Sequence, residues 1–229
     1  MSDLTIIFYT ANHISDHFMV NVTKQLKRAA GDYPIISVSQ KPMALGQNIC
    51  VGDIGRSVYN IYKQVLIGAK AAKTKYVATA EDDVLYPDNY FAHRPEDGVF
   101  AYDMNKWSIF TWVKPPFFSY RERRTMTNLT VTRDALIETL EERFEKYPDP
   151  DKIPAHYWGE PGRYEGRMGL TEVKDERYRS YIPSIVFSTE EALAYANLGS
   201  RKRHSIIRAT ALWGWDINAE EALKLYVKD

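Results

Sequence analysis

The stretch Tyr76-Val77-Ala78-Thr79-Ala80-Glu81-Asp82-Asp83 places three consecutive carboxylates directly after a short apolar run. Residues 76–80 are uncharged and β-compatible, which predicts a buried strand. Because that strand delivers adjacent negative charges to one point, their repulsion favours raised carboxylate pKa values or a bound cation. Oxygen ligands of this kind suit magnesium or manganese better than zinc. Taken alone, the triplet is explained equally well as a solvated acidic turn.

The composition is that of an ordinary globular chain with enough material for a sizeable core. Of the 229 residues, 45% are hydrophobic and 26% are charged. Basic and acidic residues balance at 30 each, so no overall field favours nucleic acid or an anionic membrane. The single cysteine, Cys50, fits a reducing compartment. With no membrane-spanning apolar run and no signal-peptide pattern, we expect a cytoplasmic protein that does not enter a membrane.

Strand and helix patterns alternate in the first half of the chain. Strands are predicted at residues 4–10, 34–39, 76–80, 98–102 and 107–113, and helices at residues 15–31 and 57–72. Residues 40–55 contain one proline and three glycines, and they predict an irregular loop. This order predicts an α/β fold with a mostly parallel sheet and helices on both faces. In such sheets, ligands bind beyond the carboxyl ends of the strands.

The second half is less regular. Pro115-Pro116 marks a boundary between residues 1–113 and residues 114–229, which we expect to be two halves of one continuous domain. Helices are predicted at residues 134–147, at residues 188–199 and from residue 218 onward, and a strand at residues 182–187. Residues 156–169 contain four glycines and Trp158, a composition typical of a functional loop.

The helix start at residues 55–62 and the strand ending in Glu81-Asp82-Asp83 together resemble the core of GT-A fold glycosyltransferases, and the family 2 type most closely. Those enzymes have an Arg/Asn-containing helix start, a helix, and a strand that ends in an acidic "DxD" motif. The resemblance covers roughly the first half of the chain, and Glu81 departs from the family's usual aspartate. It implies a Rossmann-type, GT-A-like sheet with a donor-binding half, residues 1–113, and an acceptor-binding half, residues 114–229.

The resemblance also implies a metal-dependent glycosyltransferase with a nucleotide-sugar donor, a UDP-sugar in the first instance. Asp83 would hold Mn²⁺ or Mg²⁺, which bridges the donor diphosphate and stabilises the charge on the leaving group. Asp82 or Glu81 would face the ribose or orient water on the metal. Thr10 and Asn12, which follow the first strand, would contact the nucleotide.

Several cationic residues are candidates for the diphosphate. Arg56 precedes a helix N-terminus, where a guanidinium group and free backbone N–H groups both favour phosphate. Many members of this fold take a third metal ligand from a late histidine, which makes His204 a candidate. Its neighbours Arg201 and Arg203 would neutralise the departing diphosphate. The alternative for Arg201, Arg203 and His204 is a plain basic surface loop.

The catalytic base is the least specified role. An inverting enzyme needs a carboxylate to take the proton of the acceptor hydroxyl. Glu160 lies in Trp158-Gly159-Glu160-Pro161-Gly162, a glycine-flexible loop with an indole that is able to stack on a sugar. The loop faintly resembles the Trp-Gly-Gly-Glu-type segment of some galactosyltransferases. Glu165, Glu172 and Asp175 compete with Glu160, and a charged surface loop explains any one of them as well.

The acceptor stays open between a saccharide and a hydroxymethylated base in DNA. A second basic cluster keeps a DNA acceptor open, although no nucleic-acid-binding motif is present. Its members are Arg121, Arg123, Arg124 and Arg133. The alternative is a solvated face paired with the acidic helix of residues 138–145.

Two other functions also stay open. A nucleotidyltransferase uses a strand-end acidic pair, but it usually has a glycine-rich loop where this chain has Tyr9-Thr10-Ala11-Asn12-His13. A non-catalytic nucleotide-sugar binding module would keep the sheet without the chemistry, and the intact carboxylate triplet argues against it. The sequence specifies neither the sugar and nucleotide, nor the anomeric outcome, nor the oligomeric state.

Overall fold

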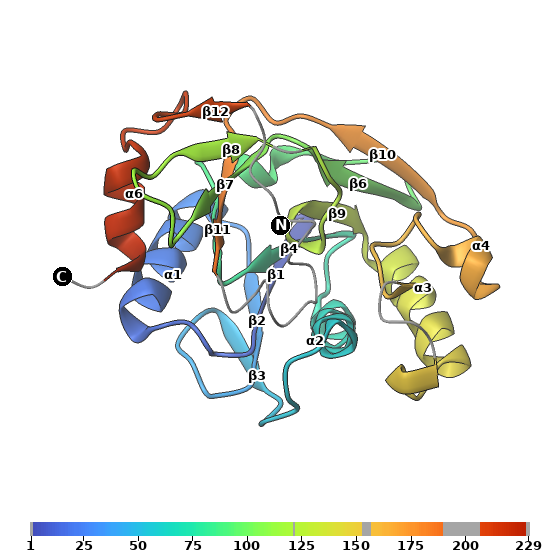
Figure 1. Cartoon of the computed structure of the whole chain (residues 1–229). Coiled ribbons are helices and arrows are strands. Elements are labelled where there is room, and N and C mark those ends of the chain that lie inside the picture. Colours follow the sequence, from blue (N-terminus) through green and yellow to red (C-terminus); the bar gives the residue numbers. More distant parts are fainter. Residues whose placement is uncertain (1, 121, 153–156, 190–206, 228–229) are drawn as a thin grey trace.

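The computed structural model describes residues 2–120, 122–152, 157–189 and 207–227, which form two sheets and their covering helices (Figure 1). The larger sheet contains β1 (Leu4–Thr10), β2 (Ile35–Ser39), β3 (Gln47–Cys50), β4 (Tyr76–Glu81), β6 (Val99–Asp103), β9 (Leu129–Thr132) and β10 (Lys174–Tyr178). The smaller sheet contains β5 (Val84–Leu85), β7 (Lys106–Phe110), β8 (Phe118–Tyr120), β11 (Ser184–Ser188) and β12 (Arg208–Ala209). The helices are α1 (Asp16–Ala30), α2 (Val58–Ala71), α3 (Arg133–Lys146), α4 (Glu165–Met168) and α6 (Ala219–Tyr226), with short turns η1 (Tyr90–Ala92), η2 (Met126–Asn128) and η3 (Pro150–Lys152).

The larger sheet is mostly parallel, as the alternation of strands and helices predicts. Its order is β10-β6-β9-β4-β1-β2-β3, and that of the smaller sheet is β12-β8-β7-β11-β5. β1 pairs in parallel with β2 and with β4, whereas β9 runs antiparallel between β4 and β6. Strands from both sides of residue 113 therefore share each sheet.

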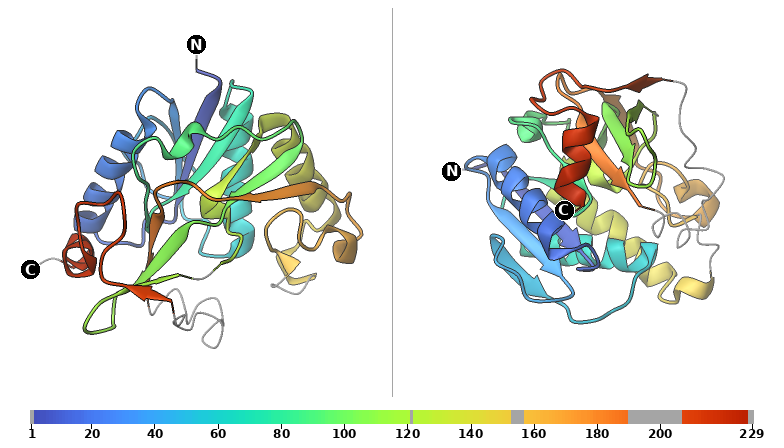
Figure 2. Two further views of the ribbon diagram at one scale, coloured as in Figure 1. Left: turned by 90° about the horizontal axis from the view of Figure 1, so that it is seen from above. Right: turned by 60° about the vertical axis from the view of Figure 1, so that its left-hand side comes forward.

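Helices cover both faces of the larger sheet. Because successive strand residues point to opposite faces, Ile6 and Phe8 of β1 pack into one core while Ile7 and Tyr9 pack into the other. The first core lies under α1 and α6, which run side by side (Figure 2), and the second lies under α2 and α3. A Cβ atom at Gly68 of α2 would lie 2.4 Å from Ile7 Cγ2, so glycine permits the close approach of α2 to β1.

The predicted ends of α1 and the predicted start of α2 are confirmed. The Ser15 hydroxyl accepts the N–H of Phe18 at the start of α1 (3.2 Å), and Ser57 accepts that of Asn60 at the start of α2 (3.0 Å). Gly31 ends α1 with a φ of 54°, in the left-handed region that glycine tolerates best.

Three sequence predictions are wrong in part. The loop of residues 40–55 contains β3, which adds an edge strand to the larger sheet. Ser188 is the last residue of β11 rather than the start of a helix, and residues 190–199 lie outside the described part of the chain. Besides β3, five strands of the described residues were not predicted: β5, β8, β9, β10 and β12. None of the helices within the described residues combines the length and apolar character needed to cross a bilayer.

Candidate functional site

The carboxylate triplet lies where the chain passes from the larger sheet to the smaller sheet. Glu81 is the last residue of β4 in the larger sheet, and β5 of the smaller sheet begins two residues after Asp82. The N–H of Phe187 in β11 donates to the backbone oxygen of Asp83 (2.7 Å), which fixes this turn to the smaller sheet. Asp82 and Asp83 therefore lie at the carboxyl edge of the parallel strands, where ligands of α/β sheets bind.

Asp82 lies among three other residues that the sequence predicts for the site. The Thr10 hydroxyl donates to Asp82 Oδ2 across the adjacent ends of β1 and β4. Burial, and after it the charge of Asp83, raise the pKa of Asp82 to about 7, against the Thr10 hydrogen bond and the charge of Arg56. The structure thus brings Thr10, Arg56, Asp82 and Asp83 into one electrostatic unit.

Glu81 points away from this unit. Alternation along β4 sends its side chain toward the α2 face of the sheet, where the Tyr9 hydroxyl donates to Glu81 Oε2 at 3.4 Å. Burial raises the pKa of that tyrosine, and the charge of Glu81 raises it further. Glu81 and Asp82 therefore accept side-chain hydrogen bonds from different residues, although they are neighbours in the sequence.

Asn12 organises the loops at the edge of the site. Its backbone has a φ of 54°, and its side-chain oxygen accepts the N–H groups of Gln40 (2.9 Å) and Lys41 (2.8 Å). Its own N–H donates to Thr10 Oγ1 (2.8 Å), which orients the Thr10 hydroxyl so that its proton points to Asp82. The Asn12 side-chain oxygen thus holds the loop after β2, and the backbone of Asn12 supports the carboxylate.

The helix that follows Arg56 braces the same strand ends. Gln64 of α2 is buried, and its amide donates to the carbonyl oxygens of Thr10 and Val38, both at 2.9 Å. These bonds lock the carboxyl ends of β1 and β2 to the helix. Gln64 was not predicted as a site residue; its signal in the sequence is a single polar residue on the apolar face of the predicted helix.

The loop that carries Glu160 is clamped, which corrects the prediction of a glycine-flexible loop. Arg143 of α3 donates to the carbonyl oxygen of Gly159 (2.8 Å) and forms a fully buried ion pair with Glu165. The other carboxylate oxygen of Glu165 accepts the N–H of Gly162 (2.9 Å). The buried ion pair and the hydrogen bonds to the backbones of Gly159 and Gly162 hold the loop on both sides of Glu160.

The contacts around Glu160 also correct the roles predicted for Trp158 and Glu165. Trp158 is 4% exposed and packs on Tyr59 with their ring centroids 5.0 Å apart, so its indole belongs to the core and is not free to stack on a sugar. Of the competing carboxylates, Glu165 is the buried partner of Arg143. The Glu160 side chain itself is 17% exposed and lies 3.2 Å from a guanidinium nitrogen of Arg163.

Asp175 and one member of the second basic cluster, Arg124, form an ion pair with each other. Arg124 forms an ion pair with Asp175 (2.8 Å) and donates to the backbone of Gly162 (3.0 Å). Arg133 lies at the start of α3, at the opposite edge of the larger sheet. Arg121 is outside the described residues, as are the site candidates Arg201, Arg203 and His204. Arg124 and Arg133 are therefore each paired with an aspartate, Asp175 and Asp134 respectively.

Lys106 is a buried charge near this site that the sequence analysis did not identify. It is 3% exposed, begins β7, and donates from Nζ to Thr125 Oγ1 (2.5 Å). Burial holds the pKa of Lys106 well below its ordinary value and the charge of Arg123 lowers it further, while the charges of Glu160, Asp103 and Asp83 oppose the shift. A lone lysine at the head of an apolar run was the available signal.

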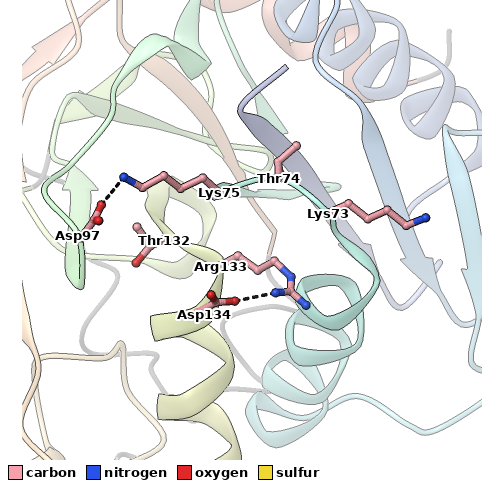
Figure 3. A pocket seen from close by; sticks show the side chains of 7 residues that line it. All are labelled: Lys73, Thr74, Lys75, Asp97, Thr132, Arg133 and Asp134. Atoms are coloured by element: carbon pink, nitrogen blue, oxygen red, sulfur yellow. Dashed lines mark hydrogen bonds and ion pairs between the residues drawn. The ribbon is translucent and has the colours of Figure 1, made fainter. Parts of the chain in front are cut away.

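A charged cavity of about 480 Å³ lies at the opposite edge of the sheet (Figure 3). Its lining residues are Lys73, Thr74, Lys75, Asp97, Thr132, Arg133 and Asp134. Lys75 pairs with Asp97 (2.7 Å) and Arg133 pairs with Asp134 (2.6 Å), so these cations already have carboxylate partners. This cavity is separate from the strand ends that carry the acidic triplet.

Asp82 and Asp83 could supply part of the coordination shell of a divalent cation, with water and phosphate oxygens supplying the rest. Within the described residues, no three His, Cys, Asp or Glu side chains converge as a complete metal site. Magnesium usually takes one or two carboxylates and completes its shell with water and substrate phosphates. The hard oxygens of Asp83 and Asp82 match that kind of incomplete donor set.

No family model and no curated protein matches the sequence. Among solved structures, the chain is similar to a nucleotidyl transferase from Methanothermobacter thermautotroptrophicus (10% identity, 62% of this chain and 76% of that chain, TM-score 0.40). It is also similar to the bifunctional IspDF from Campylobacter jejuni (10% identity, 78% of this chain and 50% of that chain, TM-score 0.43). A third likeness is to a glycosyltransferase involved in the glycosylation of the major capsid of PBCV-1 (11% identity, 78% of this chain and 82% of that chain, TM-score 0.42). At these scores the likenesses bear on neither substrate nor activity.

Proposed function

We propose that the protein is a metal-dependent glycosyltransferase that moves a sugar from a nucleoside-diphosphate sugar to an acceptor hydroxyl. The observation that carries the proposal is the unit formed by Thr10, Arg56, Asp82 and Asp83 at the carboxyl ends of β1 and β4. Adjacent carboxylates beside an arginine, at the ligand-binding edge of an α/β sheet, suit a cation–diphosphate pair.

The donor would lie across the turn between the two sheets. Asp83 would hold Mn²⁺ or Mg²⁺, and the bound cation would supply Lewis-acid stabilisation of the leaving diphosphate. Arg56, next to the N-terminus of α2, would bind a phosphate oxygen. Asp82, whose carboxylate is oriented by Thr10, would accept a hydrogen bond from the ribose or from water.

The transfer step needs a group that takes one proton. The acceptor oxygen forms a bond to the anomeric carbon while the bond from that carbon to the phosphate oxygen breaks, and the diphosphate leaves with the bonding electrons. Glu160 would take the hydroxyl proton of the acceptor. The clamped backbone of its loop supports this role, because a base acts only from a fixed position.

The nucleotide, the sugar and the acceptor are tested together by a transfer assay. The full chain is incubated with Mn²⁺ and each of several UDP-sugars, with either an oligosaccharide or hydroxymethylated DNA as acceptor, and products are detected by mass spectrometry. We expect a mass gain of one sugar on one acceptor class and its loss in Asp83→Ala. Release of pyrophosphate from a nucleoside triphosphate, without sugar transfer, would instead identify a nucleotidyltransferase. Nucleotide-sugar binding without turnover on any acceptor would favour the non-catalytic module.

A further inference from the structure

The two edges of the larger sheet differ in charge. Within the described residues, β10 forms one edge and β3 forms the other (Figure 1). β10 begins with four charged side chains in a row, Lys174-Asp175-Glu176-Arg177, and charged side chains protect an edge strand from pairing with a further strand. By contrast, no charged residue lies between Lys41 and Asp53, the segment that contains β3. The β3 edge therefore lacks the protection that the β10 edge has.

Alternate residues of β3 direct their backbone groups away from β2. In a parallel pair, the N–H and C=O groups of every second residue bond to the neighbouring strand. The N–H of Val51, directly after β3, donates to the Ser39 oxygen of β2 (2.9 Å). Ile49 faces β2 in the same way, whereas the backbone groups of Asn48 and Cys50 face the open edge. The described residues supply no hydrogen-bond partner for these outward groups.

The outward groups match those of a second copy of β3 in antiparallel orientation. A twofold axis through Ile49 places Asn48 of one copy opposite Cys50 of the other, so each residue both donates to and accepts from its counterpart. This register uses every outward backbone group of β3. The axis also brings the two Ile49 side chains together at about 5 Å between Cβ atoms. Ile49 packs against the core under α2, so the apolar row on that face continues across the axis.

We propose that the β3 edge is a dimerisation surface, on which a second copy of this chain adds its own β3 in antiparallel orientation. Backbone hydrogen bonds across the axis supply affinity, as they do when a peptide adds a strand to an open edge. A twofold axis places identical side chains near each other, and the lack of charge in residues 42–52 avoids repulsion between like charges. The result is an isologous dimer in which the two larger sheets are continuous.

Substitutions at position 50 test the edge without removing a bond to β2. Cys50 is exposed and its N–H faces away from β2, so Cys50→Pro removes a donor that only the second copy would use. Cys50→Lys keeps the N–H and adds the charge that β3 lacks.

Two control variants match these changes. Cys50→Ser keeps an uncharged side chain and the backbone N–H. Arg177→Pro makes the backbone change at the other edge of the sheet. There the N–H of Met104 donates to the Tyr178 oxygen (2.8 Å), so the backbone groups of Arg177 face outward from β10.

Sedimentation velocity in reducing buffer measures the mass of each variant over a series of protein concentrations. We expect the wild type to shift with concentration from the 26.5 kDa of one chain toward twice that mass. The dissociation constant should rise by at least about 10-fold in Cys50→Pro, because both copies lose a hydrogen-bond donor. It should also rise in Cys50→Lys, which places one lysine on each side of the axis. Cys50→Ser and Arg177→Pro should dimerise like the wild type.

A wild-type chain that stays monomeric up to about 1 mM overturns the proposal. A dimer that persists unchanged in a folded Cys50→Pro variant also overturns it, because the interface then lies elsewhere. The same holds for a dimer that Arg177→Pro weakens as much as Cys50→Pro does. If circular dichroism shows that Cys50→Pro does not fold, Cys50→Lys decides the question alone. None of these outcomes depends on the proposed glycosyltransferase activity.

Discussion

Breaking the buried ion pair between Arg143 and Glu165 should destabilise the whole chain. Arg143 is 0% exposed and Glu165 is 3% exposed, so loss of either partner leaves a charge in a low-dielectric interior. Removing one partner of such a pair costs about 3–5 kcal/mol. For a chain of this length, that corresponds to a Tm lower by about 6–20 °C.

The pair is tested by a double-mutant cycle of Arg143→Met and Glu165→Gln. Each single variant should lose about 3–5 kcal/mol in the free energy of unfolding. The double variant should be more stable than the sum of the two losses predicts, because it leaves no uncompensated charge. Unfolding in urea is followed by tryptophan fluorescence, to which the buried Trp158 in the clamped loop contributes.

Two results would refute the reasoning about this pair. One is a loss below about 1 kcal/mol in both single variants, the value of an exposed pair. The other is strict additivity in the double variant, which would show that the two side chains contribute independently.

Three further predictions concern the frame of the site and the pH dependence of stability. Asn12→Ala should lower stability by about 1–3 kcal/mol, because two backbone N–H groups lose their shared acceptor; thermal unfolding that matches the wild type would contradict this role. Gly214→Ala should lower the Tm, since its φ is 75° and the new Cβ would lie 2.5 Å from Ile182 Cγ1; circular dichroism melting curves measure this shift. Burial raises the pKa of Asp103 in the folded state. The contribution of this carboxyl to the free energy of unfolding is therefore fully present below the unfolded pKa, where it is protonated in both states. That contribution is lost as the pH rises through the folded pKa. Asp103→Asn should therefore gain in Tm relative to the wild type as the pH rises above the ordinary pKa of an aspartate, and a Tm difference that is constant with pH would refute the assignment.

Local sequence pattern was sufficient to predict α1, α2 and β4. The apolar spacing within residues 15–31 and 57–72 predicts α1 and α2 to within about one residue at each end. The strand that ends at Glu81 is predicted because it is buried on both faces and reads as one apolar run.

The elements that were missed have no such local signal. β10 reads Lys-Asp-Glu-Arg-Tyr because it is an edge strand with exposed side chains, so no apolar run marks it. β9 is four residues long and follows directly on η2, without a turn signal. The position of each depends on partners far away in the sequence.

The residues of the candidate site likewise include some that local sequence predicts and others that it does not. Residues that follow predicted strands, such as Thr10 and Asp82, are predicted together because parallel strands end at one edge. The clamp on the Glu160 loop is not, because Arg143 and Glu165 lie on separate elements and look like ordinary charged helix residues. Lys106 is similar, since its burial depends on the packing of the smaller sheet over η2.

The proposed function requires that Asp83 and its neighbours bind a divalent cation together with a nucleoside diphosphate. The most direct measurement is the Tm of the wild type and of Asp83→Ala with Mn²⁺ alone, with UDP alone, and with both. At ligand concentrations 100-fold above Kd, binding adds about 2.7 kcal/mol, which raises the Tm of a chain of this length by about 5–10 °C. We expect this rise for the wild type with both ligands and its loss in Asp83→Ala. A wild-type Tm that ignores Mn²⁺ and UDP, or an equal rise in Asp83→Ala, would contradict it.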